Sequence, residues 1–151
     1  MAADASTIHA SAVLVGPKAI LIRGPSGSGK STLAWNLVTA SEQGVLPFAR
    51  LVADDRAYLE SRSGRLLVRP AETLAGMIEI HGLGIRQIEF EPTAVVRLVV
   101  DLSAADAARN PLAEARSAGI QGITLPRLPV AAGIVALPLV LAALRIPSAG
   151  N

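Results

Sequence analysis

The chain has 151 residues, of which 51% are hydrophobic and 17% are charged, and 14 basic residues against 12 acidic ones give a net charge of +2. This composition excludes a mainly disordered chain, because disordered segments are poor in apolar residues. The absence of cysteine excludes disulfides, thiolate metal sites and cysteine nucleophiles, and it fits a reducing compartment, so we expect a cytoplasmic protein. The length predicts one domain over residues 1–151.

Neither nucleic acid nor a membrane is an expected partner. The arginines are scattered singly between Arg23 and Arg145, without the basic cluster of a nucleic-acid-binding surface. The uncharged stretch 128–144 is shorter than the ~20 residues that a membrane-spanning helix needs. Residues 1–12 carry Asp4 and no basic segment, which is unlike a secretory signal.

In the first half of the chain, short apolar runs alternate with turn residues. Residues 10–15 and 18–23 flank Gly16-Pro17 and predict a β-hairpin. From Lys30 the apolar residues recur at helical spacing up to Gly44, which is typical of the position after a helix. Residues 50–53 predict a strand, and residues 58–60 and 66–69 flank Ser63-Gly64 in a second predicted hairpin. Residues 70–76 predict a short helix with its proline at the start.

The second half combines strand-like and helix-like segments. Residues 77–80 predict a strand that leads into the glycine-rich segment 81–84, and the Val-rich run 94–102 predicts a central strand. The alanine-rich segment 104–118 predicts a helix broken at Asn110-Pro111. Within residues 128–144 we expect a buried strand near 133–136 and then a helix opened by Pro138. Together these segments predict an α/β fold with a mixed β-sheet and flanking helices.

Residues 24–31, Gly-Pro-Ser-Gly-Ser-Gly-Lys-Ser, match the phosphate-binding pattern G-x-x-x-x-G-K-[ST] in full. The predicted strand before the loop and the predicted helix after it are the context that this P-loop requires. In such a loop, backbone N–H groups and the helix N-terminus converge on an anion. We predict that Lys30 reaches the terminal phosphates and that the Ser31 hydroxyl holds Mg²⁺. The predicted nucleotide-binding residues are Gly24, Pro25, Ser26, Gly27, Ser28, Gly29, Lys30, Ser31 and Thr32.

The segment 51–55, Leu-Val-Ala-Asp-Asp, is a short apolar strand that ends in two carboxylates. A strand of this kind forms the second half of many nucleotide sites, where an aspartate holds the metal. One of Asp54 and Asp55 is expected to face the metal, and the other to face the opposite side, toward an acceptor hydroxyl.

These residues alone are compatible with three functions. The chain could be a protein kinase, a P-loop small-molecule kinase, or a non-catalytic nucleotide-binding switch. A guanine-nucleotide switch is disfavoured, because neither Lys18 nor Lys30 lies in an Asn-Lys-x-Asp element. No arginine cluster of the kind found in the lids of small-molecule kinases is visible in the sequence.

Four features together resemble the catalytic, C-terminal domain of the bacterial HPr kinase/phosphorylase family. They are His9, the loop 24–31, the segment 51–55 and the segment 79–85, Glu-Ile-His-Gly-Leu-Gly-Ile. The resemblance covers roughly residues 9–144 and implies the P-loop-containing mixed sheet of the HPr kinase/PEP-carboxykinase-like fold. Full-length members carry a further N-terminal domain, for which this chain has no room, so it looks like the short form known from alphaproteobacteria.

The resemblance implies a function and a role for each matching residue. Members transfer a phosphoryl group from ATP, with Mg²⁺, to a serine of the phosphocarrier protein HPr, can reverse this by phosphorolysis, and form hexamers. By position, Asp55 would be the base that takes the serine proton, with His9 beside it. Lys30 would bind the phosphates, and Mg²⁺ would be held by Ser31, Glu79 and Asp54.

Three positions depart from the family pattern. His81 stands where the family usually has arginine, which replaces a fixed charge by a titratable one. Ile134 stands where a stretch linked to dephosphorylation ends in arginine. The segment of the family's mobile active-site arginine is compressed, with Arg109 as the best match and Arg116 as its rival. We therefore expect a better kinase than phosphorylase.

Overall fold

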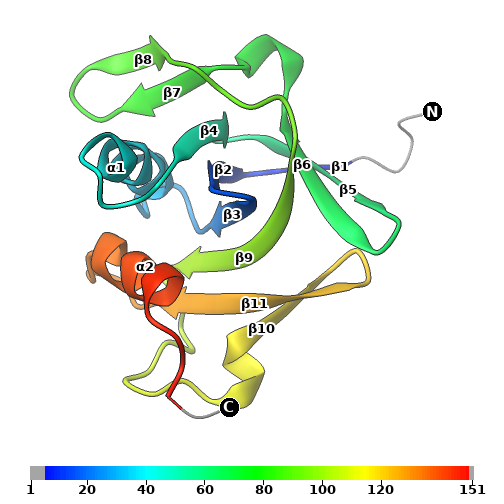
Figure 1. The fold of residues 1–151 in the computed structure, drawn as a ribbon, viewed down its shortest axis with the longest axis vertical. Coiled ribbons are helices and arrows are strands. Elements are labelled where there is room, and N and C mark those ends of the chain that lie inside the picture. Colours follow the sequence, from blue (N-terminus) through cyan, green and yellow to red (C-terminus); the bar gives the residue numbers. More distant parts are fainter. Residues whose placement is uncertain (1–5, 150–151) are drawn as a thin grey trace.

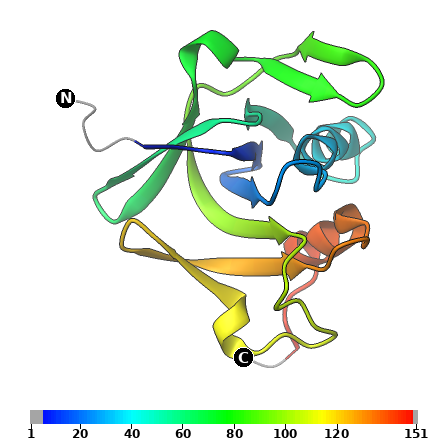
Figure 2. The ribbon, with the colours of Figure 1, turned by 180° about the vertical axis from the view of Figure 1, so that it is seen from behind.

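The computed structural model describes residues 6–149, so both ends of the predicted 1–151 domain lie outside the described residues. At its centre is a curved nine-stranded sheet, with the α-helices on one side; the β5–β6 hairpin, which is part of this sheet, projects on the side away from the helices (Figures 1 and 2). The elements, in chain order, are β1 (Ser6–Ile8), β2 (Ala10–Val15), β3 (Lys18–Arg23), α1 (Lys30–Glu42), β4 (Ala49–Ala53), β5 (Ala57–Arg62), β6 (Arg65–Pro70), β7 (Met77–Ile80), β8 (Gly84–Gln87), β9 (Ala94–Leu102), β10 (Ser117–Ile120), β11 (Ile123–Val130) and α2 (Ala136–Arg145).

The large sheet is mixed and divides at β9. On one edge β9 runs parallel to β3, which continues antiparallel to β2 and then to β4. On its other edge, the start of β9 pairs antiparallel with β6, and residues 99–102 pair in parallel with β11. The strands β7 and β8 form a separate hairpin beside α1 (Figure 1). The ends of β3, β4 and β7 are thereby brought to the start of α1.

Each face of the sheet buries its own apolar cluster. In β3, Ile20 and Ile22 pack with Leu33 and Leu37 of α1, whereas Leu21 packs on the opposite face, and all five side chains are buried. A strand buried on both faces reads as a continuous apolar run, which is what residues 19–22 show. The P-loop therefore leaves from a rigid central strand.

Several predicted elements are confirmed. The hairpin 10–15/18–23, the helix from Lys30 and the strand before Asp54 are present. In the second hairpin, Ser63 (φ 53°) and Gly64 (φ 76°) both have positive φ, as a tight two-residue turn requires. Strand β9 is central, since it is paired along both edges.

Two predicted helices are wrong. In the segment 70–76, Pro70 ends β6 by pairing with Ala57, and only a short 3-10 turn, Glu72–Leu74, follows. The segment 104–118 is irregular and then forms a 3-10 turn, Ala113–Arg116, and strand β10. Its alanines favour a helix weakly, and pairing of β10 with β11 across the turn Gln121-Gly122 overrides that preference.

The strand expected near residues 133–136 is also misplaced. The strand is β11, which ends at Val130, and Gly133 (φ 81°) lies in the turn that follows it. The helix after it is confirmed, with Pro138 in its first turn, where a missing N–H costs no hydrogen bond.

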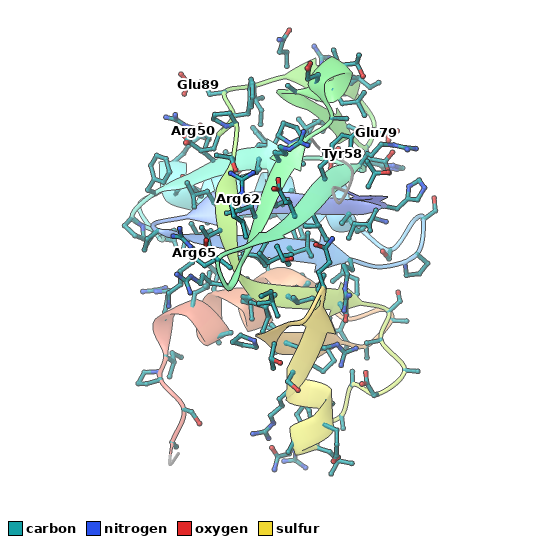
Figure 3. All side chains as sticks on the ribbon, turned by 90° about the vertical axis from the view of Figure 1, so that its right-hand side faces the viewer. Arg50, Tyr58, Arg62, Arg65, Glu79 and Glu89 are labelled. Atoms are coloured by element: carbon teal, nitrogen blue, oxygen red, sulfur yellow. The ribbon has the colours of Figure 1, made fainter. Side chains whose placement is uncertain are left out.

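Charged side chains lie on the β5–β6 hairpin and near the edge strand β4. Arg62 and Arg65 flank the β5–β6 turn, and Arg50 lies 3.8 Å from Glu89 and 3.0 Å from Glu91 (Figure 3). Across residues 6–149, every helix is too short or too polar to cross a lipid bilayer.

Candidate active site

The phosphate-binding loop curls tightly between β3 and α1. At Gly24 a Cβ atom would lie 2.6 Å from Ser28 Oγ and 3.2 Å from the Leu102 carbonyl oxygen, so only glycine fits there. Gly29 has φ 99°, a left-handed conformation that glycine adopts without strain, and it directly precedes α1. The first hydrogen bond of the helix runs from the Leu33 N–H to the Gly29 carbonyl. The amides before it are free to bind an anion.

Lys30 is held inside this loop. Its residue is 8% exposed, and its Nζ donates to the carbonyl oxygens of Gly24 at 2.9 Å and Pro25 at 3.2 Å. An ammonium group has three donors, so two carbonyls leave one for a further acceptor. The loop thus positions a cation at the place where its amides converge.

Asp54 is the centre of a buried hydrogen-bond network. It is 6% exposed and accepts from Ser11 Oγ at 2.7 Å, from Ser31 Oγ at 2.7 and 2.9 Å, and from the Glu79 N–H at 3.0 Å. The network joins β2, α1 and β7 to the end of β4. Because all its partners are donors, the arrangement suits an ionised carboxylate.

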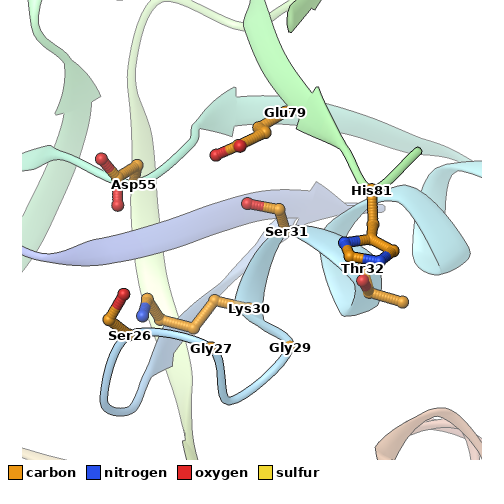
Figure 4. Close-up of a pocket in the computed structure, with 9 residues that line it drawn as sticks. All are labelled: Ser26, Gly27, Gly29, Lys30, Ser31, Thr32, Asp55, Glu79 and His81. Carbon is orange, nitrogen blue, oxygen red and sulfur yellow. The ribbon is translucent and has the colours of Figure 1, made fainter. Parts of the chain in front are cut away.

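Asp55 and Glu79 face the loop from the other side. Asp55 has φ 65°, a left-handed conformation that aspartate tolerates better than most residues, and its N–H donates to Ser11 Oγ at 3.3 Å. Glu79 lies on β7, and its side chain lines the same cavity as Lys30 and Ser31 at the start of α1 (Figure 4). Figure 4 shows both carboxylates across from the loop, with Ser31 below Glu79 and the Lys30 side chain below Asp55.

These residues line a cavity of about 320 Å³. His81 lies at the end of the cavity near Thr32, and Asp55 lies at the other end, above Ser26 and Lys30 (Figure 4). The lining residues are Ser26, Gly27, Gly29, Lys30, Ser31, Thr32, Asp55, Glu79 and His81. The cavity thus combines an anion-binding loop, a cation and two carboxylates, which is the inventory that phosphoryl transfer uses.

Two of the predicted catalytic residues stand apart from this cavity. His9 follows β1, whose Ile8 pairs with Ala57, but its side chain is exposed and forms no hydrogen bond with Asp55 within the described residues. Arg109 is exposed in the irregular segment after β9 and does not line the cavity. Arg116, its rival, bonds to Asn110 and to the Pro111 carbonyl. The roles of His9 and Arg109 stay predictions.

Sequence reasoning missed Ser11, which ties Asp54 and the Asp55 backbone together. Its side chain is fully buried in β2 and is the hydroxyl partner of both residues. The available signal is weak: Ser11 is the one polar residue in the apolar run 10–15. A buried hydroxyl needs a partner, but the sequence does not say which.

Sequence reasoning also missed an ion cluster next to the start of the loop. Arg23, the last residue before the loop, donates to Asp101 at 2.7 and 2.8 Å, and Arg127 donates to both Asp101 and Asp106. Burial opposes ionisation of Asp101, but the hydrogen bonds from the two arginines outweigh it and lower the pKa of this carboxyl. The hydrogen bond from Arg127 likewise lowers the pKa of Asp106.

Comparisons with known proteins agree on one family. The family model described as the HPr Serine kinase C-terminal domain matches residues 1–133. HPr kinase/phosphorylase of Streptococcus thermophilus is 38% identical over 84 residues, and that of Lactococcus lactis is 39% identical over 84 residues. Each alignment covers 55% of this chain and 25% of the relative, so the chain spans about a quarter of the length of the curated relatives it matches.

The fold has a counterpart among solved structures. The Hpr(Ser) kinase/phosphatase from Coxiella burnetii superposes with a TM-score of 0.72, covering 93% of this chain and 88% of that one at 24% sequence identity. This likeness confirms the predicted fold class, a mixed sheet with flanking helices.

Proposed function

The chain belongs to the HPr Serine kinase C-terminal domain family, and from this membership we propose that it is a kinase that transfers the γ-phosphoryl group of ATP, with Mg²⁺, to a serine of HPr. The observation that carries the proposal is the cavity in which Asp55 and Glu79 face the P-loop across Ser31. Phosphoryl transfer asks mainly for positioning and charge stabilisation, which these groups can supply.

The loop binds the phosphates in this proposal. The free amides at the start of α1 and the partial positive charge of the helix end receive the phosphate oxygens. Lys30 keeps its contacts with the Gly24 and Pro25 carbonyls and directs its remaining N–H to a phosphate oxygen. Lys30 thereby stabilises the negative charge that develops on the leaving group.

The donor set fits Mg²⁺. This cation is usually held by one or two carboxylates together with waters and substrate phosphates, and residues 6–149 contain no cluster of three His, Cys, Asp or Glu side chains that would form a full protein cage. Ser31 donates its proton to Asp54, which leaves its oxygen lone pairs for a cation. Ser31 and Glu79 would hold Mg²⁺, with Asp54 beside them, and the ion would neutralise charge on the β- and γ-phosphates.

Asp55 is the proposed general base. It is exposed at the cavity end near Lys30, where an acceptor hydroxyl can approach from solvent. The serine oxygen bonds to the γ-phosphorus, the bond from that phosphorus to the β–γ bridging oxygen breaks, and the serine proton passes to a carboxylate oxygen of Asp55. Asp54, which already accepts hydrogen bonds from three residues, is less available for that proton.

Phosphorolysis, the reverse reaction with inorganic phosphate, is proposed to be the weaker activity. It brings one anion up to another, so it depends more strongly on fixed positive charge. His81 lines the cavity where the family pattern has arginine, and Ile134 lies in a neighbouring groove. Neither residue supplies a permanent charge.

The test is transfer of label from γ-³²P-ATP to purified HPr with Mg²⁺, followed by mass spectrometry of the labelled residue. We expect label on a serine, and loss of that label when the serine is replaced by alanine. Lys30→Ala should bind ATP weakly and abolish transfer, because it removes the loop's cation. Label on a small molecule instead of HPr would favour a small-molecule kinase, and ATP binding without transfer would favour a nucleotide switch.

A further inference from the structure

A strained turn carries the exposed carboxylate of the candidate active site. The Arg56 N–H donates to the Asp54 carbonyl oxygen at 2.7 Å, which closes a three-residue turn with Asp55 at its centre. Asp55 has φ 65°. A γ-turn with positive φ at its central residue is rare and strained, whereas the form with negative φ is common. The backbone at Asp55 therefore needs a further interaction to hold it in the strained form.

A side chain on a neighbouring strand supplies that interaction. Within residues 6–149, the Asp55 N–H forms one hydrogen bond, which is to Ser11 Oγ on β2 at 3.3 Å. The sheet brings the two residues together: Ala12 pairs with Ala53, so Ser11 and Asp54 are the next residues along β2 and β4. The turn after β4 thus meets β2 at a single hydroxyl.

The surroundings of Ser11 leave its hydroxyl few other partners. The residue is fully buried, and its neighbours in β2, Ala10 and Ala12, are buried and apolar. Its Oγ donates its one proton to Asp54 Oδ1 at 2.7 Å, which leaves its lone pairs for the Asp55 N–H. Donation to a carboxylate polarises the hydroxyl and makes its oxygen a better acceptor. The long bond of 3.3 Å is strengthened in this way.

The two carboxylates depend on Ser11 to different degrees. Asp54 also accepts from Ser31 Oγ at 2.7 and 2.9 Å and from the Glu79 N–H at 3.0 Å. These contacts remain when the Ser11 hydroxyl is removed, whereas the Asp55 N–H loses its partner. A change at Ser11 should therefore disturb Asp55 more than Asp54.

From these observations we propose that Ser11 is a positioning residue, which holds the turn in its positive-φ form and keeps the Asp55 carboxylate in the cavity. The proposal rests on the proposed function, in which Asp55 takes the proton of the acceptor serine. Ser11 is buried and does not line the cavity, so its effect on proton transfer passes through Asp55.

The test removes this hydroxyl and keeps the strand. Ser11→Ala leaves a small side chain between two alanines, and Ser11→Cys fills the space with a weaker donor and acceptor. The matched control is Ser41→Ala, because Ser41 is a half-buried serine of α1 that donates to the Val38 carbonyl and does not line the cavity. Urea unfolding checks that each variant is folded.

The first readout separates catalysis from binding. We expect Ser11→Ala to lower the rate of transfer to HPr at saturating substrates about tenfold, the worth of one hydrogen bond, and to leave ATP affinity with Mg²⁺ within about twofold of the wild type. In the Asp55→Asn background it should cause no further loss, because the residue that it positions can no longer take a proton. Ser11→Cys should have an intermediate rate, and Ser41→Ala should behave as the wild type.

The second readout, amide hydrogen exchange measured by NMR, is independent of catalysis. The Asp55 amide should exchange about tenfold faster in Ser11→Ala, because it loses its acceptor. The Leu33 amide, which donates to the Gly29 carbonyl at the start of α1, should keep its exchange rate and serves as the internal control.

Unchanged exchange of the Asp55 amide in Ser11→Ala would overturn the proposal. So would a loss of ATP affinity without a loss of transfer rate, because Ser11 would then support Asp54 and the loop instead. An equal loss of rate from Ser11→Ala in the wild type and in Asp55→Asn would also contradict it. If the wild type does not label HPr, the proposed function fails, whereas faster exchange of the Asp55 amide would still support Ser11 as the residue that holds the turn.

Discussion

At the scale of single residues, the adjacent carboxylates Asp54 and Asp55 differ in burial, in hydrogen bonding and in backbone conformation. Asp54 is 6% exposed and saturated with hydrogen bonds, whereas Asp55 is exposed, left-handed in φ and turned toward the cavity. The left-handed backbone costs about 1–3 kcal/mol. The bond from its N–H to Ser11 Oγ helps to hold this conformation. Strain of this kind is common where a side chain must face a ligand.

The place of His81 in the cavity leads to a prediction about reaction direction. Arginine offers phosphate a permanent charge and a bidentate pair of donors, and an imidazole offers neither. We expect phosphorolysis of serine-phosphorylated HPr by the wild type to be weak, and His81→Arg to raise it. Pyrophosphate release at one fixed pH is the measurement. Strong release by the wild type would show that other arginines, such as Arg86 or Arg109, supply the charge.

Residue by residue, the P-loop side of the site is predictable from sequence and the opposite side is less so. The sequence of the loop determines the geometry of the loop, because its glycines and Lys30 interact within the loop itself. The sequence also predicts that Asp54 and Asp55 would face different ways, but not which one is buried. That depends on Ser11 and Glu79, which are distant along the chain and reach Asp54 only through the sheet topology.

At the scale of elements, one ion cluster links three neighbouring strands of the sheet, among them β3, which leads into the phosphate-binding loop. Asp101 of β9 pairs with Arg23 of β3 and Arg127 of β11, and Arg127 also binds Asp106 and the Ala115 carbonyl in the segment after β9. The side chains of Asp101 and Arg127 are each 14% exposed, so solvent screens their interaction less than that of a surface pair. The cluster therefore holds three neighbouring strand ends in register.

Loss of this cluster should destabilise the fold in a pH-dependent way. The pKa of Asp101 is lower in the folded chain than in the unfolded one, so its contribution is present above the unfolded value near 4 and is lost as the pH falls through the folded value. We expect Asp101→Asn to lower the free energy of unfolding by about 2 kcal/mol at pH 7.

Urea unfolding between pH 2 and pH 7 is the measurement for Asp101→Asn. Its free energy of unfolding should vary less with pH in the acid range than that of the wild type. Glu72→Gln, which alters an exposed carboxyl without an ion pair in the described chain, is the control and should follow the wild type. A parallel pH dependence in Asp101→Asn and wild type would contradict this role of the cluster.

Elements with strong local signals are predictable, and those that depend on distant pairing are not. Strand β9 is evident from its valines, and α1 follows from the P-loop and from Gly44. The segment 104–118 has only alanine content as a local signal, and its last residues become a strand because β11 is available to pair. Strand β11 contains two prolines, which argue against a strand in the sequence. The strand forms nevertheless, because it pairs with β9.

At the scale of the whole molecule, the topology brings three separate segments to one cavity. The loop that leads into α1, Asp55 after β4, and β7 with His81 meet there, although they are spread from Ser26 to His81. The β7–β8 hairpin beside the cavity also exposes Leu83 and Ile85. Assembly into hexamers, which the family resemblance implies, stays a prediction, as does the cytoplasmic location.

The central claim is that this cavity transfers a phosphoryl group with Asp55 as the base, and a single-turnover measurement on Asp55→Asn tests it most directly. Asparagine keeps the shape of aspartate but cannot take a proton, and base catalysis is worth about 10²–10⁴-fold. At saturating ATP, Mg²⁺ and HPr, the transfer rate of Asp55→Asn should be lower than that of the wild type by a factor in that range. Calorimetry should show that its ATP affinity equals that of the wild type. A transfer rate close to that of the wild type would contradict the account and move the base elsewhere, with Asp54 as the first candidate.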